Sequence, residues 1–225
     1  MQFTKKYLFG LALLPIAINA NADTIYDSLS AVSAVSAGFN LVSNANFGPL
    51  ADSFSTGANP FSLTDVQLAL TSNDSSTSGT VTVSLVSDNN ASLGSILATL
   101  GTISDTSLSA YTPATVDFAQ STPIQLAANT RYWIEVSATD DSSAGWSYTA
   151  DTTGTGVATE FNANSFQVYA NAGDPALALI NNPYQLQISG VTAVPLPGAA
   201  WFFAIAIGAL SALRRRHTFS NVNQA

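Results

Sequence analysis

The sequence predicts an all-β domain over residues 23–193, folded as an antiparallel β-sandwich or a jelly roll. Three observations support this prediction. Apolar and polar residues alternate with a period of two, β-branched and aromatic residues gather in the alternating runs, and turn-rich stretches separate the runs. We therefore expect about eight to ten strands in two sheets packed face to face.

The alternation is clearest in residues 80–86, 131–136 and 184–189, where every second side chain is apolar. Turn residues fill the intervals between such runs, at 71–79, 87–94, 139–145, 151–156 and 171–175. Together these patterns predict strands near residues 38–43, 49–55, 61–70, 79–87, 95–103, 114–119, 131–138, 145–150, 158–169 and 184–191.

Composition excludes several classes of function. Of the 225 residues 47% are apolar and only 9% are charged. Residues 23–193 carry fourteen acidic side chains and one basic one, Arg131, so this region has a net charge of −13. Such a surface repels phosphate backbones, which argues against nucleic-acid binding. The chain contains no cysteine, so it has neither a disulfide nor a thiolate ligand.

Residues 1–22 are predicted to be a secretory signal peptide. Lys5 and Lys6 precede an apolar run that ends near small residues, and cleavage is expected after Ala20 and Ala22, immediately before Asp23. The alternative is a membrane anchor. The run of twelve apolar residues would rise only about 18 Å as a helix, which is short for the hydrocarbon core of a bilayer.

Residues 194–216 have three parts that together predict a membrane-associated segment. A proline motif comes first, and residues 199–213 then form an apolar run that is expected to be a single short transmembrane helix. Three arginines follow as a stop-transfer signal, with residues 217–225 as a cytoplasmic tail. The motif residues are Val194, Pro195, Leu196, Pro197 and Gly198, and the stop-transfer residues are Arg214, Arg215 and Arg216.

This order of Pro-x-Pro motif, aromatic-rich apolar run and arginine cluster resembles the PEP-CTERM sorting segment. The resemblance implies that an exosortase processes the protein at the inner membrane of a Gram-negative bacterium that makes exopolysaccharide. Signal peptidase is the partner that the leader at residues 1–22 predicts. Leu196 stands where the family most often has glutamate, and residues 217–225 extend beyond the position at which the family usually ends.

Residues 25–190 resemble the choice-of-anchor R domain. The resemblance rests on the segments ADSFS, LTDVQLAL, TVTVSLVSDNN and IQLAANTRYWIEV and on the pair Gly145-Trp146, in this order. That family is defined by one β-rich domain joined to alternative C-terminal anchors, so the resemblance implies an architecture and not an activity.

No catalytic centre is predicted. The only histidine, His217, follows the arginine cluster, so a Ser-His-Asp triad cannot form within the domain. Most acidic residues lie in turns, and Glu135 and Glu160 are expected to face solvent from strands. We therefore expect a protein that is not an enzyme and needs no cofactor.

Two sets of residues are candidates for ligand binding. Asp88, Asp140 and Asp141 could supply oxygen ligands to Ca²⁺, but they lack the spacing of a calcium-binding loop, so ordinary Asx turns are the favoured interpretation. Trp133 and Trp146 could form a platform for a sugar ring, but packing in the domain interior is the alternative. Arg131 is expected to pair with a carboxylate or to meet an anionic ligand.

Two classes of function remain open from the sequence. The first is an exported, non-enzymatic protein of the cell surface or extracellular matrix, structural or adhesive in an exopolysaccharide or biofilm context. The second is a carbohydrate-binding, lectin-like sandwich or a weak glycosidase, which would need an exposed tryptophan or a pair of acids in a cleft.

Overall fold

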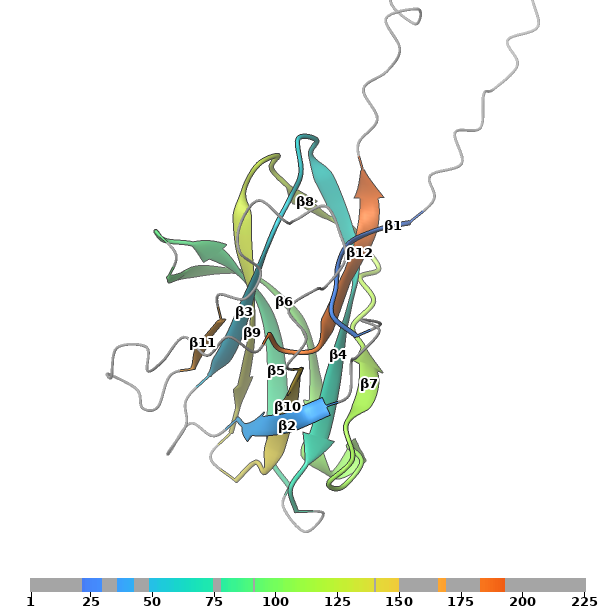
Figure 1. Ribbon diagram of the computed structural model, residues 1–225, viewed down its shortest axis with the longest axis vertical. Coiled ribbons are helices and arrows are strands. Elements are labelled where there is room, and N and C mark those ends of the chain that lie inside the picture. The colour runs from blue at the N-terminus through green and yellow to red at the C-terminus, as the bar shows by residue number, and fades with distance from the viewer. Residues whose placement is uncertain are drawn as a thin grey trace, which may run out of the picture.

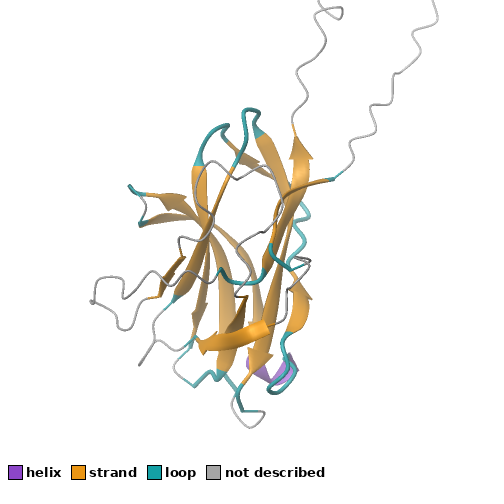
Figure 2. Cartoon of the chain, in the orientation of Figure 1, coloured by secondary structure: helices purple, strands orange, loops and turns teal. Residues whose placement is uncertain are grey.

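The computed structural model describes residues 22–29, 36–42, 49–74, 78–90, 92–139, 141–149, 166–168 and 183–192. In this part of the chain the protein is all-β, and every pair of neighbouring strands is antiparallel (Figures 1 and 2). The one helical element among these residues is a short 3₁₀ turn, η1 (Asp105–Ser107). The predicted fold class is therefore confirmed at this level.

The larger sheet has seven strands arranged around one long central strand. Its strands are β1 (Asp23–Asp27), β2 (Ser36–Leu41), β4 (Phe61–Ser72), β7 (Ala114–Asp117), β8 (Ile124–Leu126), β10 (Ala144–Thr149) and β12 (Leu186–Thr192). One edge of β4 pairs with β12 along its N-terminal part and with β10 at its C-terminal end. The other edge pairs with β8 at its N-terminal end and with β7 further along. The strands β1 and β2 lie outside β12 and β10 respectively.

The smaller sheet has five strands in the order β11-β3-β9-β5-β6. Their bounds are β3 (Leu50–Ser55), β5 (Thr80–Asp88), β6 (Leu93–Ser104), β9 (Arg131–Ala138) and β11 (Phe166–Val168). Three register shifts interrupt the pairing of β5 with β6. Because bulges bend and twist a strand pair, the distal part of this hairpin turns away from the sheet and projects from the molecule (Figure 1).

One hydrophobic core joins the two sheets. Alternate residues of the strands enter it, as the period of two predicts, and most buried apolar residues of both sheets belong to this one cluster. This arrangement is consistent with a β-sandwich. Fully buried members from the three clearest alternating runs are Val81, Val83, Leu85, Ile134, Val136, Tyr184, Leu186 and Ile188.

A carboxylate lies inside this core. Leu50 and Phe54 of β3 belong to this core cluster, so Asp52, which alternates with them and is completely buried, points inward beside them. Its two oxygens accept hydrogen bonds from the backbone N–H of Ser53, at 2.8 Å, and of Tyr184, at 3.0 Å. Burial raises the pKa of Asp52 well above the usual value, even though both bonds favour the charged form.

Tyr184 gathers further partners just before β12. Its ring stacks on Trp146 with centroids 4.3 Å apart, and its hydroxyl accepts a hydrogen bond from the Asn40 amide at 2.8 Å. The indole N–H of Trp146 donates to the carbonyl of Gln185 at 3.1 Å. Trp146 and Tyr184 are both fully buried, so their polar atoms need these partners.

Two strands were not predicted from the sequence, and one prediction extends beyond what can be described. The pairing of β1 with β12 and of β8 with β4 adds short segments that lack an alternating pattern. Of the strand expected at 158–169, only β11 lies within the described residues. In the described ranges no helix has the length and apolar character needed to cross a bilayer, and the helix expected at 199–213 lies outside those ranges.

Replacing Trp146 by alanine should lower the free energy of unfolding by about 3–5 kcal/mol, because the change removes a fully buried ring and leaves a cavity beside Tyr184. The matched control is Ile96→Ala, at a side chain that is 61% exposed, which should change the free energy by less than about 0.5 kcal/mol. Urea denaturation followed by circular dichroism measures both. Equal effects of the two changes would contradict the packing described for Trp146.

Candidate functional site

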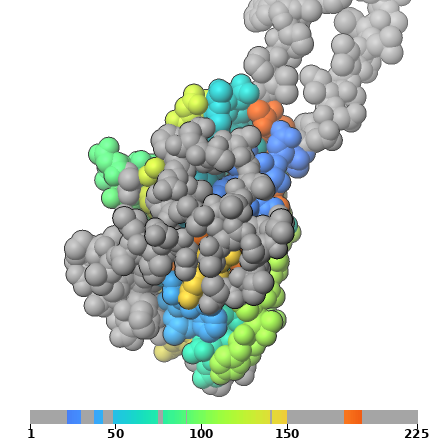
Figure 3. Space-filling view, viewed as in Figure 1, coloured from blue at the N-terminus to red at the C-terminus, as the bar shows by residue number. Residues whose placement is uncertain are grey.

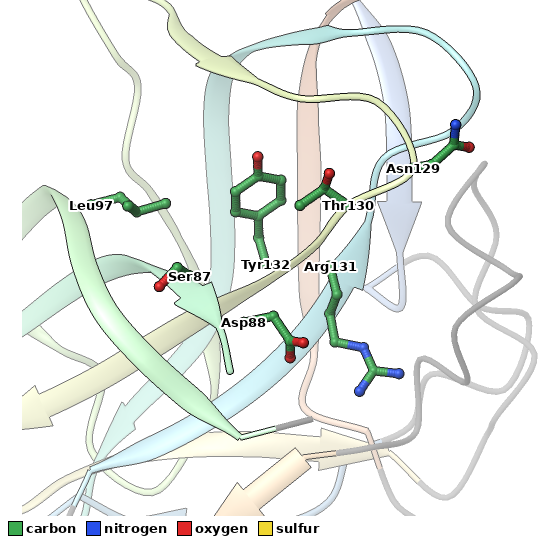
Figure 4. Close-up of a pocket in the computed structure, with 7 residues that line it drawn as sticks. All are labelled: Ser87, Asp88, Leu97, Asn129, Thr130, Arg131 and Tyr132. Atoms are coloured by element: carbon green, nitrogen blue, oxygen red, sulfur yellow. The ribbon is translucent and has the colours of Figure 1, made fainter. Parts of the chain in front are cut away.

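An open cleft of about 660 Å³ lies where the projecting β5–β6 hairpin faces the turn that leads into β9. Ser87 and Asp88 at the end of β5 and Leu97 of β6 line one side. The opposite side consists of four consecutive residues, Asn129, Thr130, Arg131 and Tyr132. Figure 4 shows Leu97 and Asn129 at opposite sides of the view, with Asp88 and Arg131 between them.

The turn before β9 is held in one conformation by Thr56. The Thr56 hydroxyl donates to the carbonyl of Ala127 at 2.6 Å and accepts from the N–H of Thr130 at 3.0 Å. Asn129 takes a left-handed conformation with φ of 48°, which asparagine tolerates better than most residues. The N–H of Ala127 donates to the hydroxyl of Tyr132 at 3.0 Å, so the core residue Tyr132 also supports the turn.

The opposite wall of the cleft belongs to the β5–β6 hairpin. Asn89 and Ser92 exchange two backbone hydrogen bonds across its loop, and Asn90 has φ of 54°. This hairpin confirms the turn predicted over residues 87–94. On β6, Ile96 is 61% exposed and Leu97 is 52% exposed, and the green tip of the hairpin projects from the surface in Figure 3.

Asp88 is held at the cleft by a buried tryptophan. Its carboxylate accepts a hydrogen bond from the indole N–H of Trp133 at 2.9 Å. Trp133 lies on the outer face of the five-stranded sheet, where it packs in a second apolar cluster with Ala51 and Val86. Because Trp133 is completely buried, Asp88 is the polar partner that its indole N–H requires.

The structure separates the ligand-binding candidates taken from the sequence. Trp133 and Trp146 are completely buried, so neither ring can stack on a sugar at the surface. Trp146 packs in the main core, and Trp133 packs in the smaller cluster on the outer face of the five-stranded sheet. Asp88 lines the cleft, Asp141 is exposed elsewhere, and Asp140 lies outside the described residues. In the described part of the chain no three histidine, cysteine, aspartate or glutamate side chains gather as a metal site would require.

Most of the terminal candidates lie outside the described residues. Ala22 and Asp23 are both exposed, and Asp23 is the first residue of β1. Ala20, the motif residues 194–198 and the arginines 214–216 are not among the residues that the structure describes.

Sequence reasoning did not single out Leu97, and it considered Asn129 and Thr130 only as part of the segment that resembles the choice-of-anchor R domain, not as binding residues. An Asn-Thr pair directly before an alternating run is a readable signal for a turn, and that signal places Asn129 and Thr130 at a strand end. Nothing in the sequence distinguishes Leu97 from a core residue, because its exposure depends on the bulges that turn the hairpin outward.

Two acidic side chains pair away from the cleft, on the seven-stranded sheet. Burial, together with a hydrogen bond and charge repulsion from Asp117, raises the pKa of Asp65 to about 6. Two carboxyl groups can share a hydrogen bond only when one of them is protonated. Glu135 was expected to face solvent, but it is half-buried, and burial raises its pKa as well.

No family model matches this chain, and a comparison with curated proteins finds no match. The resemblances to the PEP-CTERM segment and to the choice-of-anchor R domain therefore remain predictions that rest on the residues quoted for them.

Asp65→Asn should raise the melting temperature at pH 7 and flatten its dependence on pH. The pKa of Asp65 rises from 3.8 to about 6 on folding, so the folded state binds the proton more tightly. This contribution to stability is complete below about pH 4 and is lost as the pH rises through 6. Thermal melts between pH 4 and 7.5 measure the effect. The exposed Asp141→Asn is the control, and parallel profiles for Asp65→Asn and the parent chain would contradict the pairing.

Asp88→Ala should lower the free energy of unfolding by about 1–3 kcal/mol, because it leaves the buried indole N–H of Trp133 without an acceptor. Asp88→Asn retains a side-chain oxygen at the same place and should cost much less. Urea denaturation followed by tryptophan fluorescence compares the two variants. If they are equally destabilised, the loss reflects the charge of Asp88 and not its hydrogen bond to Trp133.

Proposed function

We propose that this chain is an exported, non-enzymatic protein of the bacterial cell surface or extracellular matrix, sorted through its C-terminal segment and structural or adhesive in role. The observation that carries the proposal is the order of segments at residues 194–216, where a Pro-x-Pro motif, a short apolar run and three arginines follow the β-rich domain. The partners implied are signal peptidase, an exosortase-type enzyme and the inner membrane.

The boundaries of the folded domain support this proposal. Strand β1 begins at Asp23, which directly follows the predicted signal-peptide cut, and β12 ends at Thr192, two residues before the proline motif. Because Asp23 pairs with Gly190 in neighbouring antiparallel strands, the domain starts and ends at the same end of the seven-stranded sheet. A domain with this geometry can stand on a membrane by either end of the chain.

Composition supports a role without catalysis. The domain has no cysteine and its sequence has no histidine before His217, so the usual nucleophile and base pairs are missing from residues 23–193. The net charge of −13 in this region favours solubility and disfavours binding to anionic surfaces.

The intact mass of the protein from the envelope fraction should correspond to a chain that begins at Asp23 and lacks the residues from Trp201 onward, apart from any attached lipid or sugar. The apolar run of fifteen residues spans only about 22 Å as a helix, which suits a segment held for processing better than a stable anchor. A mass that includes His217 to Ala225 would make the tail a plain anchor. A start at Met1 would make the leader a second anchor.

Combined Pro195→Ala and Pro197→Ala changes should cause unprocessed protein to accumulate in the inner membrane, because a helix can then extend through the motif and lengthen the span. Pro60→Ala, in an exposed loop of the domain, is the matched control and should be processed normally. Replacing Arg214, Arg215 and Arg216 by asparagine should release protein into the medium. Immunoblots of membrane fractions and medium decide the matter, and normal processing of all three variants would refute the sorting role.

A further inference from the structure

From the cleft between the β5–β6 hairpin and the turn before β9 we infer a binding site for a neutral polysaccharide chain. The inference deepens the proposed function. It rests on that function only in assuming that the protein encounters the polysaccharide outside the cell. It concerns different residues from the tryptophan platform considered from the sequence, since both of those rings are buried.

The size and position of the cleft suit a segment of a polymer. Its volume of about 660 Å³ falls within the range of small-molecule sites. The cleft is open, and one of its walls is the hairpin that projects from the surface in Figure 3, so a long chain could enter and leave without passing through a closed pocket.

The lining offers both kinds of polar group that sugar hydroxyls require. A hydroxyl donates one hydrogen bond and accepts others. The carboxylate of Asp88 is an acceptor, the guanidinium of Arg131 is a donor, and the amide of Asn129 is both. Asp88 comes from the β5–β6 hairpin, and Asn129 and Arg131 come from the turn and the start of β9, so both elements that line the cleft contribute polar groups (Figure 4).

Leu97 supplies the apolar contact. The C–H faces of a sugar ring are apolar and gain from contact with a side chain that is otherwise in water. Leu97 is 52% exposed while it lines the cleft, whereas its neighbour Ile96 is 61% exposed and is not part of the lining. The two residues therefore separate the contribution of the cleft from that of a generally apolar strand.

Charge selects a neutral polymer. The cleft contains one acidic and one basic side chain, so its local charge is balanced, while residues 23–193 as a whole carry −13. An anionic polysaccharide would approach against this field and gain contact with only one cation, because Arg131 is the only basic residue of that region.

The carboxylate of Asp88 and the backbone of the turn that carries Asn129 are held in place before any ligand arrives. Trp133 fixes the carboxylate of Asp88, and Thr56 fixes the turn that carries Asn129. Preorganised groups lose little conformational freedom on binding, which is what allows a shallow site to bind measurably.

The test is affinity electrophoresis of the purified full chain in gels that contain galactomannan, xyloglucan, dextran or alginate. At least one of the three neutral polymers should retard the protein, and the anionic alginate should not. Leu97→Ser and Asn129→Gly should each weaken the retardation about tenfold, as expected for the loss of a buried contact or a hydrogen bond. Glycine keeps the left-handed conformation that Asn129 adopts, so that variant should remain folded.

Ile96→Ser is the matched control and should bind as the parent chain does. Equal loss of binding in Ile96→Ser and Leu97→Ser would assign the effect to the exposed strand and overturn the cleft. Retardation by alginate alone, or by none of the four polymers, would overturn the neutral ligand. Membrane fractionation scores location separately. A chain that binds a neutral polymer but is not exported would support this inference and refute the proposed function. A chain that is exported but binds none of the neutral polymers would refute this inference and leave the proposed function standing.

Discussion

The hydrogen bond from the backbone N–H of Tyr184 to the buried carboxylate of Asp52 is the contact on which the arrangement of the two sheets depends. Asp52 belongs to β3 of the smaller sheet, and Tyr184 lies directly before β12 of the larger one. A polar group in an apolar core is costly unless its oxygens are satisfied, so the buried side chain of Asp52 favours the arrangement in which Tyr184 lies opposite β3. Tyr184 also contacts two further strands of the larger sheet, since Trp146 of β10 stacks on its ring and Asn40 of β2 donates a hydrogen bond to its hydroxyl.

The cleft shows how a rigid framework positions groups that the core does not use. Strands β5 and β9 pair side by side, and the ends of these two strands carry Asp88 and Arg131. Bulges turn the hairpin outward on one side, and the bonds from Thr56 restrain the turn on the other. Each device uses backbone geometry to place a side chain at the surface, so the cleft could change its lining residues without disturbing the interior.

The alternating strands were predictable from the sequence because each has one face in the core, as Val83 and Leu186 illustrate. Strands β1 and β8 were not, since a segment of three to five residues pairs according to its neighbours and not its own pattern. The partner of Asp52 could not be predicted from the sequence either, because Tyr184 is 132 positions away along the chain. Trp133 shows a further limit. It alternates with the core residue Tyr132, yet both are buried, because Ala51 and Val86 form a second apolar cluster on the outer face.

The pairing of β1 with β12 has a consequence for the order in which the domain can be completed. Thr24 and Ser189 bond across it although 165 positions separate them, and β12 is also the strand that covers most of one edge of β4. Closing so distant a contact is slow, and it cannot begin until the last strand is present. A nascent chain must therefore wait with the edge of β4 uncovered. If the chain is exported as proposed above, such late closure would leave it unfolded and competent for passage until β12 has been made.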